Sequence, residues 1–106
     1  MNSISFTNIS EGRYDRQELI SWWDQKKVSG ARVIVAGAGA LGNEVLKNLA
    51  LMGAGHITLI DFDDIAPSNL ARMVLFRESD IGRPKVEAAA ESLKKINPHI
   101  QVRAVK

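Results

Sequence analysis

The stretch Arg32-Val33-Ile34-Val35-Ala36-Gly37-Ala38-Gly39-Ala40-Leu41-Gly42 decides the fold of this 106-residue chain. Its first half is short and mostly β-branched, which is typical of a parallel strand buried on both faces. Its second half places Gly37, Gly39 and Gly42 where such a strand turns into a helix. This arrangement lets the backbone approach a phosphate and directs the free amides at the helix start toward it. Because a glycine pattern alone is weak evidence, the flanking residues must support it.

The residues that follow continue the pattern of alternating strands and helices. The predicted elements are a helix over 41–52, a strand over 57–61, a helix over 84–96 and a strand over 100–105. Gly53 and Gly55 end the first helix, and Pro84 suits the first turn of the second. A loop of more than twenty residues joins the second strand to the second helix, and a loop that long is usually functional.

Residues 1–30 are predicted to form an N-terminal helical arm, and residues 31–106 a nucleotide-binding, Rossmann-like half-domain of the α/β class with a parallel sheet. Within the arm, an amphipathic helix is predicted over about 13–27, where Trp22 and Trp23 contribute apolar bulk for packing onto the core or a subunit, and Gly30 ends it. In the usual strand order 3-2-1-4 nothing in this chain pairs with the outer edge of the first strand. We therefore expect a second chain or further residues to complete the sheet.

Composition excludes several classes of protein. With 45% apolar and 25% charged residues the chain is ordinary for a globular protein, and a net charge of +2 is too weak to indicate nucleic acid. Its apolar stretches are too short to span a bilayer and its start lacks the layout of a signal peptide, so we expect no membrane partner and a cytoplasmic location. Without cysteine there is no thiolate zinc site, and no metal ligands are predicted among these residues.

Three side chains are candidates for holding a nucleotide. Asp61 lies nineteen residues after Gly42, at the tip of the second strand, where it can accept hydrogen bonds from ribose hydroxyls. A triphosphate needs cations for its outer phosphates, and Arg72 and Lys85 are placed to supply them. Each of the two could instead be an ordinary surface cation, so both NAD and ATP stay open on this reasoning.

Five motifs together resemble the ThiF/MoeB/HesA and ubiquitin-activating enzyme superfamily. They are Arg13-Tyr14-Asp15-Arg16-Gln17, Gly37-Ala38-Gly39-Ala40-Leu41-Gly42, Asp61-Phe62-Asp63, Ser68-Asn69-Leu70-Ala71-Arg72 and Asp80-Ile81-Gly82-Arg83-Pro84-Lys85. The resemblance runs from Arg13 to Val105 and implies ATP-dependent adenylation of the C-terminal glycine of a ubiquitin-like or sulfur-carrier protein, with magnesium, in a homodimer or heterodimer.

The resemblance also implies a role for each matched residue. The glycine loop, with Gly37, Gly39, Ala40 and Gly42, would cradle the phosphates, Asp61 would hold the ribose and Asp63 would lie beside the nucleotide. Asn69, Arg72 and Lys85 would grip the phosphates and favour departure of pyrophosphate. Arg16 would reach across a dimer interface toward the partner's ATP, so that Arg16, Arg72 and Lys85 would be the catalytic residues.

The chain departs from the family pattern in two respects. Met73 stands where the family usually has glutamine. The family's magnesium-binding aspartate, and the cysteine pairs that hold zinc in many members, are expected beyond Lys106. Two alternatives stay open: an NAD-binding oxidoreductase half-domain, and a non-catalytic scaffold subunit of an activating complex.

Overall fold

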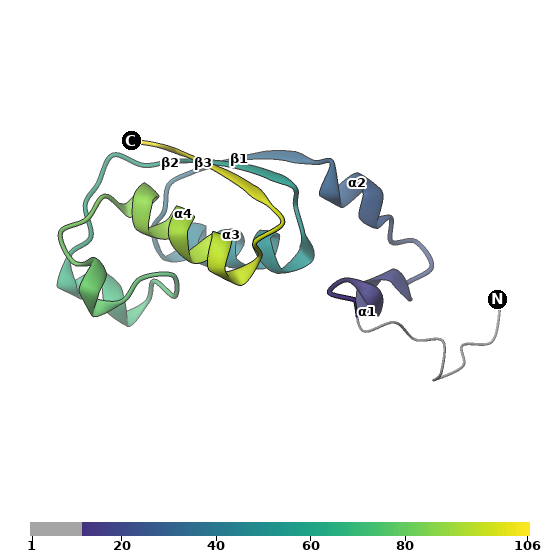
Figure 1. The fold of residues 1–106 in the computed structure, drawn as a ribbon. Helices are drawn as coiled ribbons and strands as arrows, with labels where there is room; N and C mark the ends of the chain where they lie inside the picture. Colours follow the sequence, from purple (N-terminus) through teal and green to yellow (C-terminus); the bar gives the residue numbers. More distant parts are fainter. Residues whose placement is uncertain (1–11) are drawn as a thin grey trace.

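The computed structural model describes residues 12–106, which form a three-stranded parallel sheet with two helices packed on one face (Figure 1). The strands are β1 (Arg32–Ala36), β2 (His56–Ile60) and β3 (Gln101–Val105), in the order β1-β2-β3. Their register aligns Ile34 with Thr58 and Thr58 with Arg103. The predicted α/β fold with a parallel sheet is therefore confirmed, and within the described residues β1 lies at an edge of the sheet. The first eleven residues of the predicted arm lie outside the described residues.

The core lies between the sheet and the helices α3 (Ala40–Met52) and α4 (Lys85–Ile96), which run side by side. Side chains alternate along each strand, so every second residue points toward the helices. Ile57 and Leu59 of β2 are thereby buried against Leu46 of α3 and Leu93 of α4. Both helices agree with the predicted ranges to within one residue.

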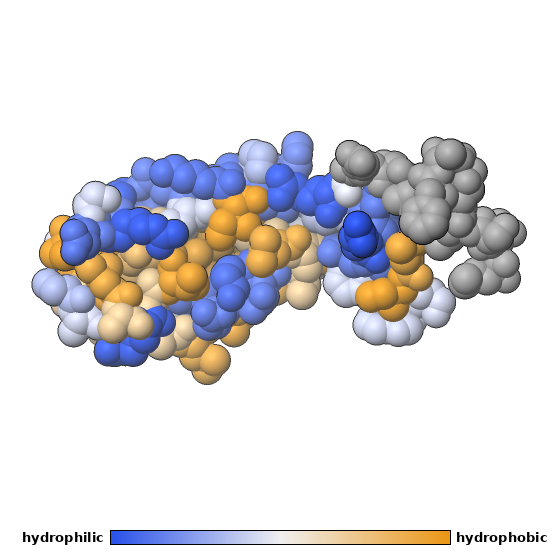
Figure 2. All heavy atoms as spheres, turned by 90° about the horizontal axis from the view of Figure 1, so that it is seen from below, coloured by the Kyte–Doolittle hydropathy of each residue, from blue (hydrophilic) through white to orange (hydrophobic). Residues whose placement is uncertain are grey.

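The opposite face of the sheet carries neither α3 nor α4. Ile34, at the centre of β1, is 71% exposed there. The expectation that β1 is buried on both faces is wrong for the described chain, because both long helices pack on the same side. The helix side also has exposed apolar residues, and Figure 2 shows them between hydrophilic side chains. Leu41 and Val45 of α3 are also exposed, and neither belongs to the hydrophobic core.

The single arm helix predicted over 13–27 is wrong, because two short helices form instead: α1 (Asp15–Glu18) and α2 (Gln25–Ser29). The second begins at Asp24, whose carboxylate accepts the backbone N–H of Lys27 at 3.3 Å. Such a cap starts a new helix, and residues 19–24 separate it from α1, which ends at Glu18. Trp22, in the break, is 77% exposed and does not pack onto the core.

The described part of the arm is joined to the C-terminal end of α3. The side-chain amide of Gln17 donates to the carbonyl of Met52 at 2.9 Å. The buried amide of Asn97 donates to the hydroxyl of Tyr14 at 2.7 Å and to the carbonyl of Ala50 at 2.9 Å. These bonds fix the arm at the end of α3 that lies farthest from the glycine loop. The division of the chain into an arm and a half-domain at residue 30 stays a prediction.

The long connection between β2 and α4 is ordered and packed. It contains two 3₁₀ turns, η2 (Pro67–Ala71) and η3 (Glu78–Asp80), and a backbone bridge between Asp64 and Pro84 closes its base. Met73, Leu75 and Phe76 of this connection belong to the hydrophobic core. Its apolar residues therefore hold it against the sheet and helices. Within residues 12–106, none of the helices combines the length and the apolar character needed to cross a membrane.

Candidate functional site

The glycine loop joins β1 to α3 and leaves space above the first turn of the helix. Gly37 has a φ of 103°, which favours glycine, and its N–H donates to the carbonyl of Ile60 at 2.7 Å. Gly39 is the N-cap of α3, and a Cβ added there would meet no atom within 4 Å. The first N–H groups of a helix have no partner within the helix, so those of Ala40 and its neighbours are available to an anion in this space.

Gly42 serves packing between the loop and the helix. A Cβ on Gly42 would lie 2.0 Å from the carbonyl oxygen of Gly37. The close approach of α3 to the end of β1 therefore requires glycine at this position. The three glycines predicted from the motif have three different structural reasons: backbone conformation, open space and close packing.

Asp61 holds the glycine loop from the neighbouring strand. Its Oδ2 accepts the N–H of Ala38 at 2.7 Å, and its Oδ1 accepts the N–H of Asp63 at 2.8 Å. A carboxylate has about four lone-pair sites, so both oxygens can accept further bonds from ribose hydroxyls. Asp61 thus joins the loop that would hold phosphate to the strand end that would hold the sugar.

Lys85 begins α4 beside Asp63. Its backbone N–H donates to the carbonyl of Asp63 at 3.0 Å, and its Nζ lies 3.8 Å from Oδ2 of the same residue. The residue is only 8% exposed although it carries an ammonium group. A cation at the first position of a helix is disfavoured by the helix dipole, so a bound anion would stabilise it there. The structure thus brings Lys85, Asp63 and Asp61 into one connected group at the end of β2.

Asn69 and Arg72 lie on the η2 turn of the connection. The Oδ1 of Asn69 accepts the N–H of Ala66 at 2.8 Å, and its carbonyl accepts the N–H groups of Arg72 and Met73. The guanidinium of Arg72 is exposed and donates to the carbonyl of Ser68 at 3.2 Å, which uses one of its five donors. Asn69 therefore shapes the turn that carries Arg72. Met73, the departure from the family pattern, is buried in the core, where an apolar side chain costs less than an amide.

Arg16 is exposed on α1, in the arm. The arm contacts the C-terminal end of α3, while the glycine loop lies at the N-terminal end of this 13-residue helix. At 1.5 Å per residue the helix separates the two by roughly 20 Å. The structure does not bring Arg16 to the glycine loop of its own chain.

Asn43 was missed in the sequence, although it is fully buried beside the glycine loop. It lies on the same face of α3 as Leu46 and Ala50, which are also fully buried. A polar residue on the apolar face of a helix is the signal that could have revealed it, because a buried amide needs partners.

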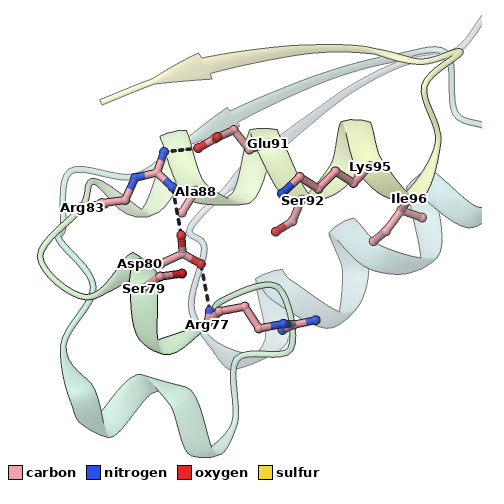
Figure 3. A pocket seen from close by; sticks show the side chains of 9 residues that line it. All are labelled: Arg77, Ser79, Asp80, Arg83, Ala88, Glu91, Ser92, Lys95 and Ile96. Atoms are coloured by element: carbon pink, nitrogen blue, oxygen red, sulfur yellow. Dashed lines mark hydrogen bonds and ion pairs between the residues drawn. The ribbon is translucent and has the colours of Figure 1, made fainter.

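A pocket of about 280 Å³ lies between η3 and α4, apart from the predicted site residues (Figure 3). Within it Arg83 points between Asp80 and Glu91 and forms ion pairs with both. The hydrogen bonds that the guanidinium of Arg83 donates to Glu91, and next to Asp80, raise the pKa of Arg83 above its ordinary value. Because Arg83 is already paired with two carboxylates, we interpret the pocket as a structural contact between α4 and the long connection that precedes it.

Comparison with known proteins identifies the family of this chain. The model of the ThiF family matches residues 14–106. The molybdopterin-synthase adenylyltransferase of Salmonella typhimurium is 43% identical over 96 residues, which cover 88% of this chain and 39% of that protein. Ubiquitin-like modifier-activating enzyme 7 of Homo sapiens is also 43% identical over 96 residues, covering 85% of this chain and 10% of that protein.

Solved structures agree with these relatives. The crystal structure of E. coli MccB with ATP superimposes with a TM-score of 0.84 at 38% identity, covering 92% of this chain and 31% of that one. The crystal structure of PaaA superimposes with the same TM-score of 0.84 at 29% identity, covering 99% of this chain and 37% of that one. This chain spans well under half the length of each of these proteins. These proteins therefore share the Rossmann-like fold that the glycine loop predicted for this chain. The match over residues 14–106 shows that the chain belongs to the ThiF family.

Proposed function

We propose that this chain supplies the nucleotide half of an ATP-dependent site that adenylates the C-terminal glycine of a ubiquitin-like or sulfur-carrier protein. One observation carries the proposal: Asp61 ties the open helix N-terminus at Gly39 to a strand end where Lys85 is buried next to Asp63. That combination offers amides, a carboxylate and a cation to one ligand. Family membership supports ATP over NAD, because the relatives compared above are named adenylyltransferases or activating enzymes.

In the proposed reaction a carboxylate oxygen of the carrier protein attacks the α-phosphorus of ATP. A carbon-bound oxygen forms the new bond to phosphorus, the bond between the α-phosphorus and the bridging oxygen breaks, and pyrophosphate leaves with the electron pair. Two anions must be held together while negative charge grows on the leaving group. Arg72 and Lys85 would neutralise that charge, and the amides around Ala40 would hold the phosphates.

The described residues fit the nucleotide better than they fit a metal. No group of three or more histidine, aspartate or glutamate side chains gathers anywhere in residues 12–106. Magnesium bound to ATP takes phosphate oxygens and water as ligands and needs only one or two carboxylates. We therefore propose that magnesium binds together with the triphosphate. The aspartate that would bind this magnesium is still predicted to lie beyond Lys106.

The proposal extends to a dimer and to a cytoplasmic setting. Because Arg16 lies at the far end of α3 from its own glycine loop, it would act on the nucleotide of a second subunit, identical or related. We also propose a cytoplasmic location, in keeping with the expectation from the sequence.

Exchange of labelled pyrophosphate into ATP tests the proposal directly. The protein, in its native length, is incubated with ubiquitin-like and sulfur-carrier proteins that end in Gly-Gly, each in a natural and a C-terminally amidated form. Exchange is expected with a natural carrier and not with its amidated form, because only a free carboxylate can attack. Arg72→Ala and Lys85→Ala should each lower the rate by about 100-fold, the usual cost of removing one group that stabilises transition-state charge.

Lys95→Ala is the matched control, since Lys95 is an exposed lysine on the same helix as Lys85. It should leave exchange unchanged, and thermal melting should show that all three variants fold. A protein that dimerises but exchanges no pyrophosphate with any carrier would contradict the proposal and favour a scaffold subunit.

A further inference from the structure

The side chain of Asn43 forms hydrogen bonds both to the glycine loop and to the long connection between β2 and α4. Its Nδ2 donates to the carbonyl of Ala38 at 2.8 Å and to that of Gly39 at 2.9 Å. Its Oδ1 accepts the N–H of Leu75 at 3.0 Å. Both amide hydrogens and an oxygen lone pair are thus used in a side chain with no exposed surface.

Through these bonds Asn43 links two segments that are far apart in sequence. On one side, both backbone polar groups of Ala38 are bonded: its carbonyl accepts a hydrogen bond from Asn43, and its N–H donates to Asp61. On the other side, Leu75 follows Arg72 by three residues in the connection. One side chain therefore joins the glycine loop and Asp61 to the segment that carries Arg72.

We propose that Asn43 is a positioning residue, which sets the separation between the glycine loop and Arg72 so that one triphosphate contacts both. This inference rests on the proposed function. A serine at this position is too short to reach Leu75 while it also bonds Ala38, so the loop and the Arg72 segment would separate. An apolar side chain would leave buried backbone groups without partners.

Asn97 offers a matched control within the same fold. It is also fully buried, and its side chain also makes three hydrogen bonds, to Tyr14, Ala50 and the N–H of His99. It lies near the other end of α3, away from the glycine loop. Asn97→Ser should therefore cost stability as Asn43→Ser does, but it should leave the separation between the glycine loop and Arg72 unchanged.

A double-mutant cycle on pyrophosphate exchange separates positioning from stability. Arg72→Ala is measured in the wild-type, Asn43→Ser and Asn97→Ser backgrounds of the full-length protein, with melting temperatures recorded for each. If Asn43 positions Arg72, the loss of about 100-fold caused by Arg72→Ala should shrink to about tenfold or less in the Asn43→Ser background. The loss should stay near 100-fold in the Asn97→Ser background, because distant and independent sites are additive.

Additive losses in both backgrounds of an active protein would overturn this inference and leave the proposed function intact. An inactive wild-type protein would overturn the two together. If Asn43→Ser does not fold, amide hydrogen exchange of the wild-type protein provides the test. A non-hydrolysable ATP analogue should slow exchange at Leu75 together with the glycine loop, and an unchanged rate at Leu75 would contradict the proposal.

Discussion

At the scale of single residues, the glycines of the loop differ in why glycine is needed: one for packing and another for open space. Gly42 is needed for packing, since an added Cβ would lie 2.0 Å from the carbonyl oxygen of Gly37. Gly39 is not needed for packing, since an added Cβ would meet nothing within 4 Å. Its φ of −78° also suits any residue. Open space at Gly39 is explained if a phosphate occupies it in the complex.

Gly42→Ala should therefore destabilise the fold itself. The backbone of α3 or of the loop must move to accept the methyl group, and overpacking of this kind costs about 1–3 kcal/mol. Chemical denaturation monitored by circular dichroism measures this loss.

Gly39→Ala should leave the free energy of unfolding almost unchanged and weaken ATP binding by about tenfold or more, equivalent to about 1.4 kcal/mol or more. The physical reason is that the methyl group would occupy the space proposed for phosphate. Titration calorimetry with ATP measures the binding. Equal affinities of the wild-type protein and Gly39→Ala would show that no phosphate approaches this backbone.

At the scale of elements, the sequence predicted regular structure well and its exceptions poorly. The strands, α3 and α4 follow from periodicity because each packs its apolar residues on one core. The arm was mispredicted because α1 ends at Glu18 and a separate helix, α2, begins at the cap formed by Asp24. The two 3₁₀ turns of the long connection could not be predicted, because they depend on contacts with distant elements.

The candidate site shows the same limit. Its glycines, Asp61 and Lys85 could be proposed from the sequence because they lie at the ends of predicted strands and helices. The hydrogen-bond partners of Asn43 and Asn97 could not be predicted, because these bonds join residues up to 83 positions apart. Such partners become visible only when the chain is folded.

The junction between η3 and α4 offers a test of how the connection is held. Arg83 is shared by two carboxylates, Asp80, which is buried, and Glu91, which is exposed. Asp80 also accepts the backbone N–H of Arg77 at 2.8 Å. Asp80→Ala should lower the free energy of unfolding by about 1–3 kcal/mol, because it leaves a part-buried donor without its partner.

Glu91→Ala serves as the control at the same guanidinium, and it should cost at most about 1 kcal/mol because exposed ion pairs contribute little. Urea denaturation compares the two variants. Equal losses would mean that the junction depends on charge alone and not on the buried backbone bond.

At the scale of the whole molecule, α3 separates two regions for which we propose different roles. Its N-terminal end carries the glycine loop, and its C-terminal end carries the arm with Arg16. The sheet face opposite the helices leaves Ile34 exposed, and β1 has a free outer edge in the described chain. This chain also spans only 39% of its Salmonella relative. These features agree with a nucleotide half that works together with further protein.

The central claim is that this half binds ATP through Lys85, and titration calorimetry on the full-length protein tests it most directly. Magnesium-ATP and NAD are titrated into the wild-type protein, Lys85→Gln and the control Lys95→Gln. We expect ATP to bind in preference to NAD. The affinity for ATP should fall about tenfold or more in Lys85→Gln, equivalent to about 1.4 kcal/mol, and should be unchanged in Lys95→Gln. Preference for NAD, or ATP binding indifferent to Lys85→Gln, would contradict it.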